Sequence, residues 1–303
     1  MTETQTSPAP ARREALLAAL VVTLGIYLFH VLGNASNVDM EGRSLFAWIG
    51  RQLIVRGGDF SHGWIIPLVS LALVWWRRRA LREAPKSVSA AGLAVVAGAL
   101  ALHALALRAQ QPRLSLVALT ALLWGIPYFV YGPAVARVIR FPCAYLLLSF
   151  TAYVLVYFSF PLRLFSCVLA SGLLNGMGIA TERVGTALHA TAGGGFHFDV
   201  ADPCSGLRSL FVMTALAAPY AYLTQRTPLR QWALFLLSVP LAMLSNTFRI
   251  VTVALAAQAF GQQFALTVYH DYSGYIVFTL SIVLLTAAGA LVARVGARPG
   301  GAA

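Results

Sequence analysis

Long apolar stretches alternate with short polar segments along almost the whole chain. A helix needs roughly 20 apolar residues to cross a bilayer, so this pattern predicts about eight transmembrane helices. They are expected near residues 15–32, 63–76, 88–107, 114–131, 141–160, 204–223, 232–248 and 272–292. Residues 161–180 and 250–268 are also apolar but carry polar side chains. The pattern leaves open whether these two stretches span the membrane or are re-entrant or interfacial.

Two of the intervening segments have a periodicity of their own. Residues 45–54 are amphipathic and are expected to lie at the membrane interface. Residues 196–201 alternate between apolar and polar side chains, which is the period of a short strand. The predicted fold class is therefore an all-α integral membrane protein of about eight transmembrane helices. It has interfacial or re-entrant segments and a short β-like extracytoplasmic loop before Cys204.

The composition agrees with this fold class. Of the 303 residues, 59% are hydrophobic and only 11% are charged, and the mean hydropathy is +0.75. A water-soluble domain of this size does not have such a composition. We expect a single polytopic membrane domain over residues 14–296, with cytoplasmic tails at residues 1–13 and 297–303.

The formal net charge of +12 does not indicate nucleic-acid binding, because the basic residues lie at the ends of apolar segments. With the N-terminus inside and neither ambiguous stretch crossing the membrane, thirteen of the 22 basic residues face the cytoplasm. They are Arg12, Arg13, Arg77, Arg78, Arg79, Arg82, Lys86, Arg137, Arg140, Arg226, Arg230, Arg294 and Arg298. Seven of the ten acidic residues then lie outside. This eight-span arrangement obeys the positive-inside rule in its short loops.

Residues 202–208 read as the start of a helix that carries a thiol. Asp202 is a suitable N-cap and Pro203 a suitable first helical residue, which places Cys204 in the first turn. There the positive end of the helix dipole favours a thiolate, and Arg208 adds positive charge one turn later. Asp202 opposes this effect. The alternative interpretation is a buried structural cysteine.

Four polar clusters share the extracytoplasmic face in this topology. They are residues 59–63, Cys204 with Arg208, residues 246–249 and residues 270–274. Singly, Arg249 is explained as a snorkelling helix end, and His62 and His270 as interfacial loop residues. Together, a thiol, an imidazole and a guanidinium supply the nucleophile, the acid/base and the oxyanion-binding cation of cysteine acyl transfer. The three cysteines have no metal-ligand spacing, and neither a metal nor a cofactor is expected.

These clusters resemble the exosortase/archaeosortase family of integral membrane cysteine transpeptidases. The resemblance covers about residues 15–295. It rests on Cys204-Ser205-Gly206, on Asn246-x-x-Arg249, on His270 and on the segment Asp59-Phe60-Ser61-His62-Gly63-Trp64-Ile65-Ile66-Pro67. The chain departs from the family pattern at Pro203, where alanine is frequent, and at Phe60, where tyrosine is common.

The resemblance implies a substrate class and a set of roles. Substrates would be exported proteins that end in a Pro-Glu-Pro-type (PEP-CTERM-like) motif, a transmembrane helix and an arginine-rich tail. Cys204 would form a thioester, His270 would act as acid and base, and Arg249 would bind the oxyanion. Auxiliary or substrate-binding roles would fall to Arg208, Ser205, Asn246, His62 and Ser61. The expected location is the bacterial cytoplasmic (inner) membrane, with the site on the extracytoplasmic face, the lipid bilayer as surroundings and an unidentified acceptor.

Two other functions remain open at the level of the sequence. One is a membrane cysteine protease that uses water as the acceptor. The other is a transporter or channel with a polar pathway of Arg and His, which would tolerate Cys204→Ser. His189 and His197, in the segment before Cys204, are rival candidates for the base.

Overall fold

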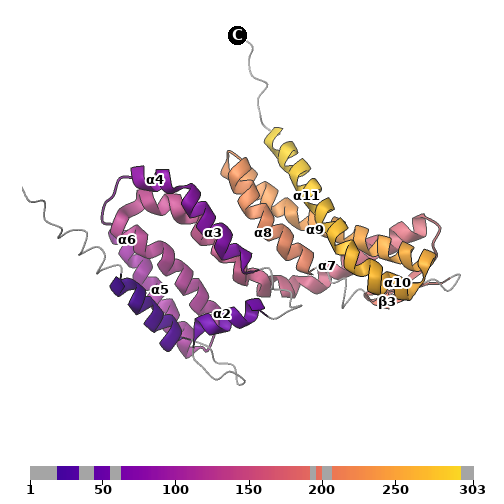
Figure 1. Cartoon of the computed structure of the whole chain (residues 1–303), viewed down its shortest axis with the longest axis horizontal. Helices are drawn as coiled ribbons and strands as arrows, with labels where there is room; N and C mark the ends of the chain where they lie inside the picture. The colour runs from indigo at the N-terminus through magenta and orange to yellow at the C-terminus, as the bar shows by residue number, and fades with distance from the viewer. Residues whose placement is uncertain (1–18, 34–43, 55–62, 192–195, 200–206, 295–303) are drawn as a thin grey trace, which may run out of the picture. The chain divides into compact units, whose positions relative to one another are not determined.

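A computed structural model describes residues 19–33, 44–54, 63–191, 196–199 and 207–294 (Figure 1). Its contacts divide the chain into two compact units, residues 1–150 and 151–303. Each unit is described by itself. The prediction of one domain over residues 14–296 stays a prediction.

The first unit is helical throughout its described part. An apolar helix, Ala19–Val31, ends in a π-helical turn, η1 (Tyr27–Val31). The helices that follow are α2 (Leu45–Ile54), α3 (Ile65–Trp76), α4 (Arg78–Glu83), α5 (Ala90–Arg108) and α6 (Pro112–Leu146). The amphipathic segment predicted at residues 45–54 is thus a helix with the predicted bounds.

Close backbone approach joins α5 and α6, which lie side by side (Figure 1). Gly92 of α5 sits against the backbone of Tyr128 and Phe129 of α6, so that a Cβ atom there would collide with main-chain atoms. The buried His103 of α5 lies 3.2 Å from Ser115 Oγ through Nδ1 and 3.2 Å from the Leu28 carbonyl oxygen through Nε2. This histidine therefore ties α6 and the first apolar helix to α5.

The break predicted after residue 131 is present, because Gly132 is non-helical and separates two helical stretches within α6. Gly132 has φ +87°, a left-handed conformation that favours glycine, and Pro133 follows it. The freed carbonyl groups accept bonds from another segment: Ser87 N–H donates to Tyr131 O at 3.2 Å, and Ser89 N–H to Phe129 O at 3.0 Å. These two bonds pair carbonyl groups that the break in the helix leaves free.

The second unit combines helices with a small sheet. Its elements are α7 (Leu148–Gly176), β1 (Thr181–Val184), β2 (Ala187–Ala190), β3 (His197–Asp199), α8 (Leu207–Thr224), α9 (Pro228–Phe260), α10 (Gln262–Phe264), η2 (Ala265–Tyr269) and α11 (His270–Arg294). The strand predicted near residues 196–201 is present as β3. The ambiguous stretches continue their helices, to Gly176 in α7 and to Phe260 in α9.

The three strands form an antiparallel sheet in the order β1-β2-β3. Leu188 and Phe198 pair across β2 and β3 and are buried, so one face of the sheet packs against the protein. Asn175 near the end of α7 binds Thr181 twice, accepting from its N–H at 2.8 Å and donating to its carbonyl at 3.0 Å. This side chain fixes the exit from α7 into β1.

Two separate hydrophobic clusters hold the second unit together. The hairpin cluster joins α8, α9 and α11 and contains Leu210, Met213, Ala217, Ala221, Leu234, Ala242 and Leu285. The sheet cluster joins the end of α7, the buried face of the sheet, the second half of α9 and η2; it contains Cys167, Ala170, Leu174, Leu188, Phe196, Phe198, Ile250, Val251, Val253, Ala254, Ala256, Ala257 and Ala265.

The predicted fold class, an all-α membrane protein with a short β segment before Cys204, is confirmed. Within the described residues, four helices are long and apolar enough to cross a membrane: Ala90–Arg108, Pro112–Leu146, Pro228–Phe260 and Tyr272–Arg294. Shorter apolar helices are Ala19–Val31, Ile65–Trp76, Phe160–Gly176 and Ser209–Thr224. The count of eight spans stays a prediction.

Two glycines of α5 provide a test of the α5–α6 contact. Gly92→Ala should lower the free energy of unfolding by about 1–3 kcal/mol, since the helices must separate to admit the methyl group. Gly98→Ala, in the same helix with nothing within 4 Å of its Cβ position, should be neutral or slightly stabilising. Thermal unfolding of the detergent-purified protein measures both. Equal midpoints for the two variants would contradict the close approach.

Candidate functional site

Arg249, in the second half of α9, is held by two residues of α11. Its Nε donates to Ser273 Oγ at 3.0 Å. Its Nη2 lies 2.9 Å from His270 Nε2 and donates to the His270 carbonyl oxygen at 3.2 Å. Ser273 Oγ in turn donates to the same carbonyl at 2.7 Å. Two residues that the sequence placed in separate clusters, Arg249 and His270, are therefore in direct contact.

The contact between Arg249 and His270 defines the state of the imidazole. A guanidinium has only donors, so the 2.9 Å bond requires His270 Nε2 to act as the acceptor. On this hydrogen-bonding argument His270 is a neutral imidazole with its proton on Nδ1. Since Nδ1 then carries the proton, His270 can take up a further proton only at Nε2, and for this the bond from Arg249 Nη2 must be given up.

The backbone around His270 is irregular in a way that sets its position. Gly261, with φ +86°, lets the chain leave the end of α9, and the π-helical turn η2 leads directly into His270. A π turn accommodates one more residue than an α turn and is frequent at functional sites. It rotates the residues that follow, here His270 and Ser273, relative to a continuous α-helix.

Two buried polar atoms near Arg249 have no hydrogen-bond partner. They are Asn246 Oδ1 and Ser245 Oγ, on residues that are 3% and 0% exposed. Both lie within one turn of Arg249 on α9, so they share its side of the helix. Buried polar groups are nearly always hydrogen-bonded, so these two oxygens are places where donors from water or from a ligand can bind.

Arg249, His270 and their polar neighbours fall between the two hydrophobic clusters of the second unit. On α9, Ala242 belongs to the hairpin cluster and Ile250 to the sheet cluster, and Ser245, Asn246 and Arg249 occupy the interval. The C-terminal chain also passes from Ala265 in the sheet cluster to Leu285 in the hairpin cluster, and His270 and Ser273 lie between. We call this interval the polar layer.

Helix α8 begins at the level of the polar layer. Gln225 Nε2 donates to the Gly289 carbonyl at 3.1 Å, and a Cβ atom at Gly289 would lie 2.7 Å from the Tyr220 ring, so the C-terminal ends of α8 and α11 lie together. Helix α9 returns antiparallel after a short turn capped by Thr227. The 18 residues of α8 rise about 26 Å, and the same rise along α9 from Pro228 reaches Ser245. Leu207, the first residue of α8, therefore lies opposite Ser245.

Several residues predicted for the site fall where the structure gives no description. Cys204, Ser205, Ser61 and His62 lie outside the described residues, and so does the side chain of Arg208. Of the predicted site residues, the structure brings together Arg249 and His270 and places Asn246 one turn from Arg249.

The rival histidines occupy another surface. His189 and His197 face each other across β2 and β3, with their Nδ1 atoms 2.5 Å apart. They point away from the sheet face that buries Leu188 and Phe198, so they do not join Arg249. In the part of the chain that the structure describes, no group of three or more His, Cys, Asp or Glu residues could hold a metal ion.

Neither Ser273, although it lies in the predicted cluster at residues 270–274, nor Ser245 was assigned a role from the sequence. Ser273 lies three residues after His270, which is the spacing of neighbours on one helix face. That spacing was a usable signal. Ser245 carried none, because a single serine in an apolar helix is common.

Comparison with known proteins places the chain among membrane proteins of one type. A family model described as transmembrane exosortase matches residues 54–287. The matched region includes all the residues of the polar layer described above. Neither the curated proteins nor the solved structures yielded a match to the chain.

Asn246 provides a test of whether the polar layer serves the fold or a ligand. Asn246→Leu removes a buried oxygen that has no partner, so the free energy of unfolding should stay unchanged or rise, by on the order of 1 kcal/mol. Ser238→Val is the matched control: Ser238 is equally buried on α9, but its hydroxyl donates to Phe235 O at 2.6 Å. Thermal unfolding in detergent measures both variants. A marked loss of stability in Asn246→Leu would show that the carboxamide supports the fold.

Proposed function

Because the chain belongs to the transmembrane exosortase family, we propose that it is a membrane cysteine transpeptidase that processes the C-terminal sorting signals of exported proteins. The recognised signal is a Pro-Glu-Pro-type motif followed by a transmembrane helix and an arginine-rich tail. Cleavage proceeds through a thioester on Cys204, and an acceptor nucleophile receives the acyl group. The proposal places the site on the extracytoplasmic face of the bacterial cytoplasmic membrane.

The observation that carries this proposal is the contact between Arg249 and His270 at the level where α8 begins. Cys204 precedes Leu207 by three residues, and three residues of chain span at most about 11 Å. The sequence therefore ties a thiol to the end of α8 that faces Ser245 and the polar layer. A nucleophile, a base and a cation within that reach are the components of acyl transfer.

The residues of the polar layer suit the first half of the reaction. His270 Nε2 exchanges its bond from Arg249 Nη2 for the Cys204 proton, and the thiolate attacks the scissile carbonyl carbon to form a carbon–sulfur bond. The carbonyl oxygen becomes an oxyanion, which Arg249 stabilises. Among the described residues, the bonds of Arg249 use Nε and Nη2, so Nη1 is the group assigned to the oxyanion. Collapse breaks the peptide C–N bond, and His270 passes its proton to the leaving amine.

In the second half of the reaction, the acceptor nucleophile takes the place of the leaving amine. The thioester remains on Cys204 while the released tail stays in the membrane. His270, neutral again, removes a proton from the acceptor, whose nucleophilic atom attacks the thioester carbonyl. Breaking the carbon–sulfur bond returns the Cys204 thiolate, which recovers its proton from His270. Arg208, Ser205, Asn246, His62 and Ser61 are assigned auxiliary or substrate-binding roles.

Substitutions at Cys204, His270 and Arg249 should impair substrate processing in distinct ways. Cys204→Ala prevents the acyl-enzyme, so uncut substrate accumulates. His270→Ala slows both proton transfers. Arg249→Lys keeps the charge but loses the planar fork that reaches both Ser273 and an oxyanion, and should cost on the order of 100-fold in rate. The measurement is processing of a co-expressed reporter that carries the three-part tail, with membrane abundance checked by immunoblot.

The matched control is Arg226→Lys, an exposed residue at the turn between α8 and α9, which should process normally. Normal processing by Arg249→Lys at normal abundance would remove Arg249 from the chemistry. Mass analysis of the product separates transfer from hydrolysis, and full processing by Cys204→Ala would reject the cysteine mechanism.

A further inference from the structure

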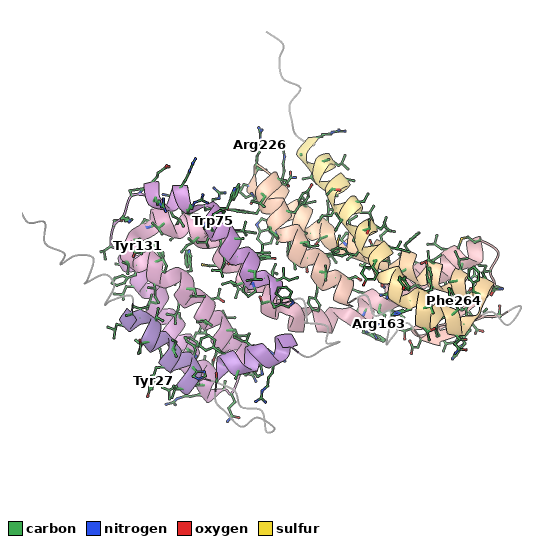
Figure 2. All side chains as sticks on the ribbon, viewed as in Figure 1. Tyr27, Trp75, Tyr131, Arg163, Arg226 and Phe264 are labelled. Atoms are coloured by element: carbon green, nitrogen blue, oxygen red, sulfur yellow. The ribbon has the colours of Figure 1, made fainter. Side chains whose placement is uncertain are left out.

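Besides Arg249, the second unit has an arginine with a buried nitrogen that makes no hydrogen bond. Arg163, on α7, is half-buried, and its Nε has no hydrogen-bond partner. Figure 2 labels this residue on the described part of α7. A guanidinium nitrogen withdrawn from water without an acceptor is costly, so such an atom is retained where an anion can bind it.

The neighbours of Arg163 place it with the polar layer. Leu162 packs against the hairpin cluster, while Cys167 belongs to the sheet cluster. Arg163 and the buried Ser166 therefore occupy on α7 the same interval between the clusters that Asn246 and Arg249 occupy on α9. Three segments of the chain thus contribute polar residues to one layer.

The described part of the unit offers no carboxylate to Arg163. Its described acidic side chains are Glu182 and Asp199, both exposed on the sheet, and Asp199 accepts a bond from Thr186 at 2.7 Å. Arg249, in contrast, is fixed by Ser273 and His270. The two arginines are therefore suited to different tasks: Arg249 is held in place, and the fork of Arg163 can receive a planar anion in two parallel hydrogen bonds.

We propose that Arg163 binds a carboxylate of the substrate beside the scissile bond and is a specificity-determining residue. The inference rests on the proposed function, because it takes a peptide as the occupant of the polar layer. A peptide is favoured over a lipid headgroup because Asn246 Oδ1 and Ser245 Oγ are unpaired acceptors at the same level. Peptide N–H groups satisfy such acceptors, whereas a lipid phosphate has no donor of its own and only some headgroups carry one.

The test is a binding measurement that does not depend on cleavage. The full chain carrying Cys204→Ala is placed in phosphatidylcholine nanodiscs. It is titrated against a fluorescent peptide that contains the Pro-Glu-Pro motif, and against the same peptide with glutamine in place of glutamate. Arg163→Gln should weaken binding of the glutamate peptide by about 10-fold or more, the scale of a charge-assisted hydrogen bond. It should leave the affinity for the glutamine peptide unchanged, and Arg163→Lys should be intermediate.

The matched control is Arg226→Gln, exposed at the opposite end of α8 from the polar layer; Figure 2 shows Arg226 and Arg163 at opposite ends of these helices. If the Arg163→Gln variant binds the glutamate peptide as tightly as the protein that keeps Arg163, the proposal is overturned. An equal loss of affinity for both peptides also overturns it, because that result marks a structural role. If phosphatidylglycerol in the nanodiscs abolishes the difference between the two peptides, the site binds lipid phosphate, which is a third contradicting result.

The proposed function is tested separately, by measuring cleavage of the reporter in the protein that keeps Cys204. Cleavage without Arg163-dependent binding rejects the role of Arg163 alone. Arg163-dependent binding without cleavage rejects the transpeptidase while leaving the carboxylate site standing.

Discussion

The guanidinium of Arg249 is the group on which the arrangement of the second unit depends. A charge within a largely apolar unit must be paired or hydrogen-bonded, and here three contacts from one turn of α11 do this. Because these contacts come from both the side chain and the carbonyl of His270, the start of α11 cannot rotate without losing them. The π-helical turn η2 sets the rotation of α11 that brings His270 and Ser273 to Arg249.

The apolar packing leaves room for this polar arrangement. A single continuous core along α9 would bury Ser245 and Asn246 among aliphatic side chains and make their unpaired oxygens a pure loss. Instead, the hairpin cluster ends at Ala242 and the sheet cluster resumes at Ile250. The small sheet contributes to stability by covering the second cluster, and Asn175 sets the point at which α7 turns into it. Stability and chemistry are thus assigned to different stretches of the same helix.

The sequence predicted the features that depend on local composition. Apolar length indicated a helical membrane protein, amphipathicity indicated α2, and alternation indicated β3. It also named Arg249 and His270, because their residue types and order resemble those of the exosortase family. It did not predict that helices run on past Phe160 and Phe248, because a proline such as Pro161 and polar residues such as Asn246 and Arg249 occur both at helix ends and inside helices. The roles of Ser273, Ser245 and Arg163 depend on contacts between segments distant in sequence, which periodicity does not contain.

The proposed mechanism requires that Cys204 lie within reach of the polar layer. Short-range cross-linking tests it in a chain lacking Cys143 and Cys167, with a protease site engineered into the turn between α8 and α9. Cys204 is paired with Ser273→Cys, or with Thr286→Cys about 20 Å further along α11. A short bismaleimide should keep the two fragments joined after proteolysis in the Ser273→Cys protein and not in the Thr286→Cys protein. Joining through position 286, or through neither position with both cysteines labelled, would contradict the claim.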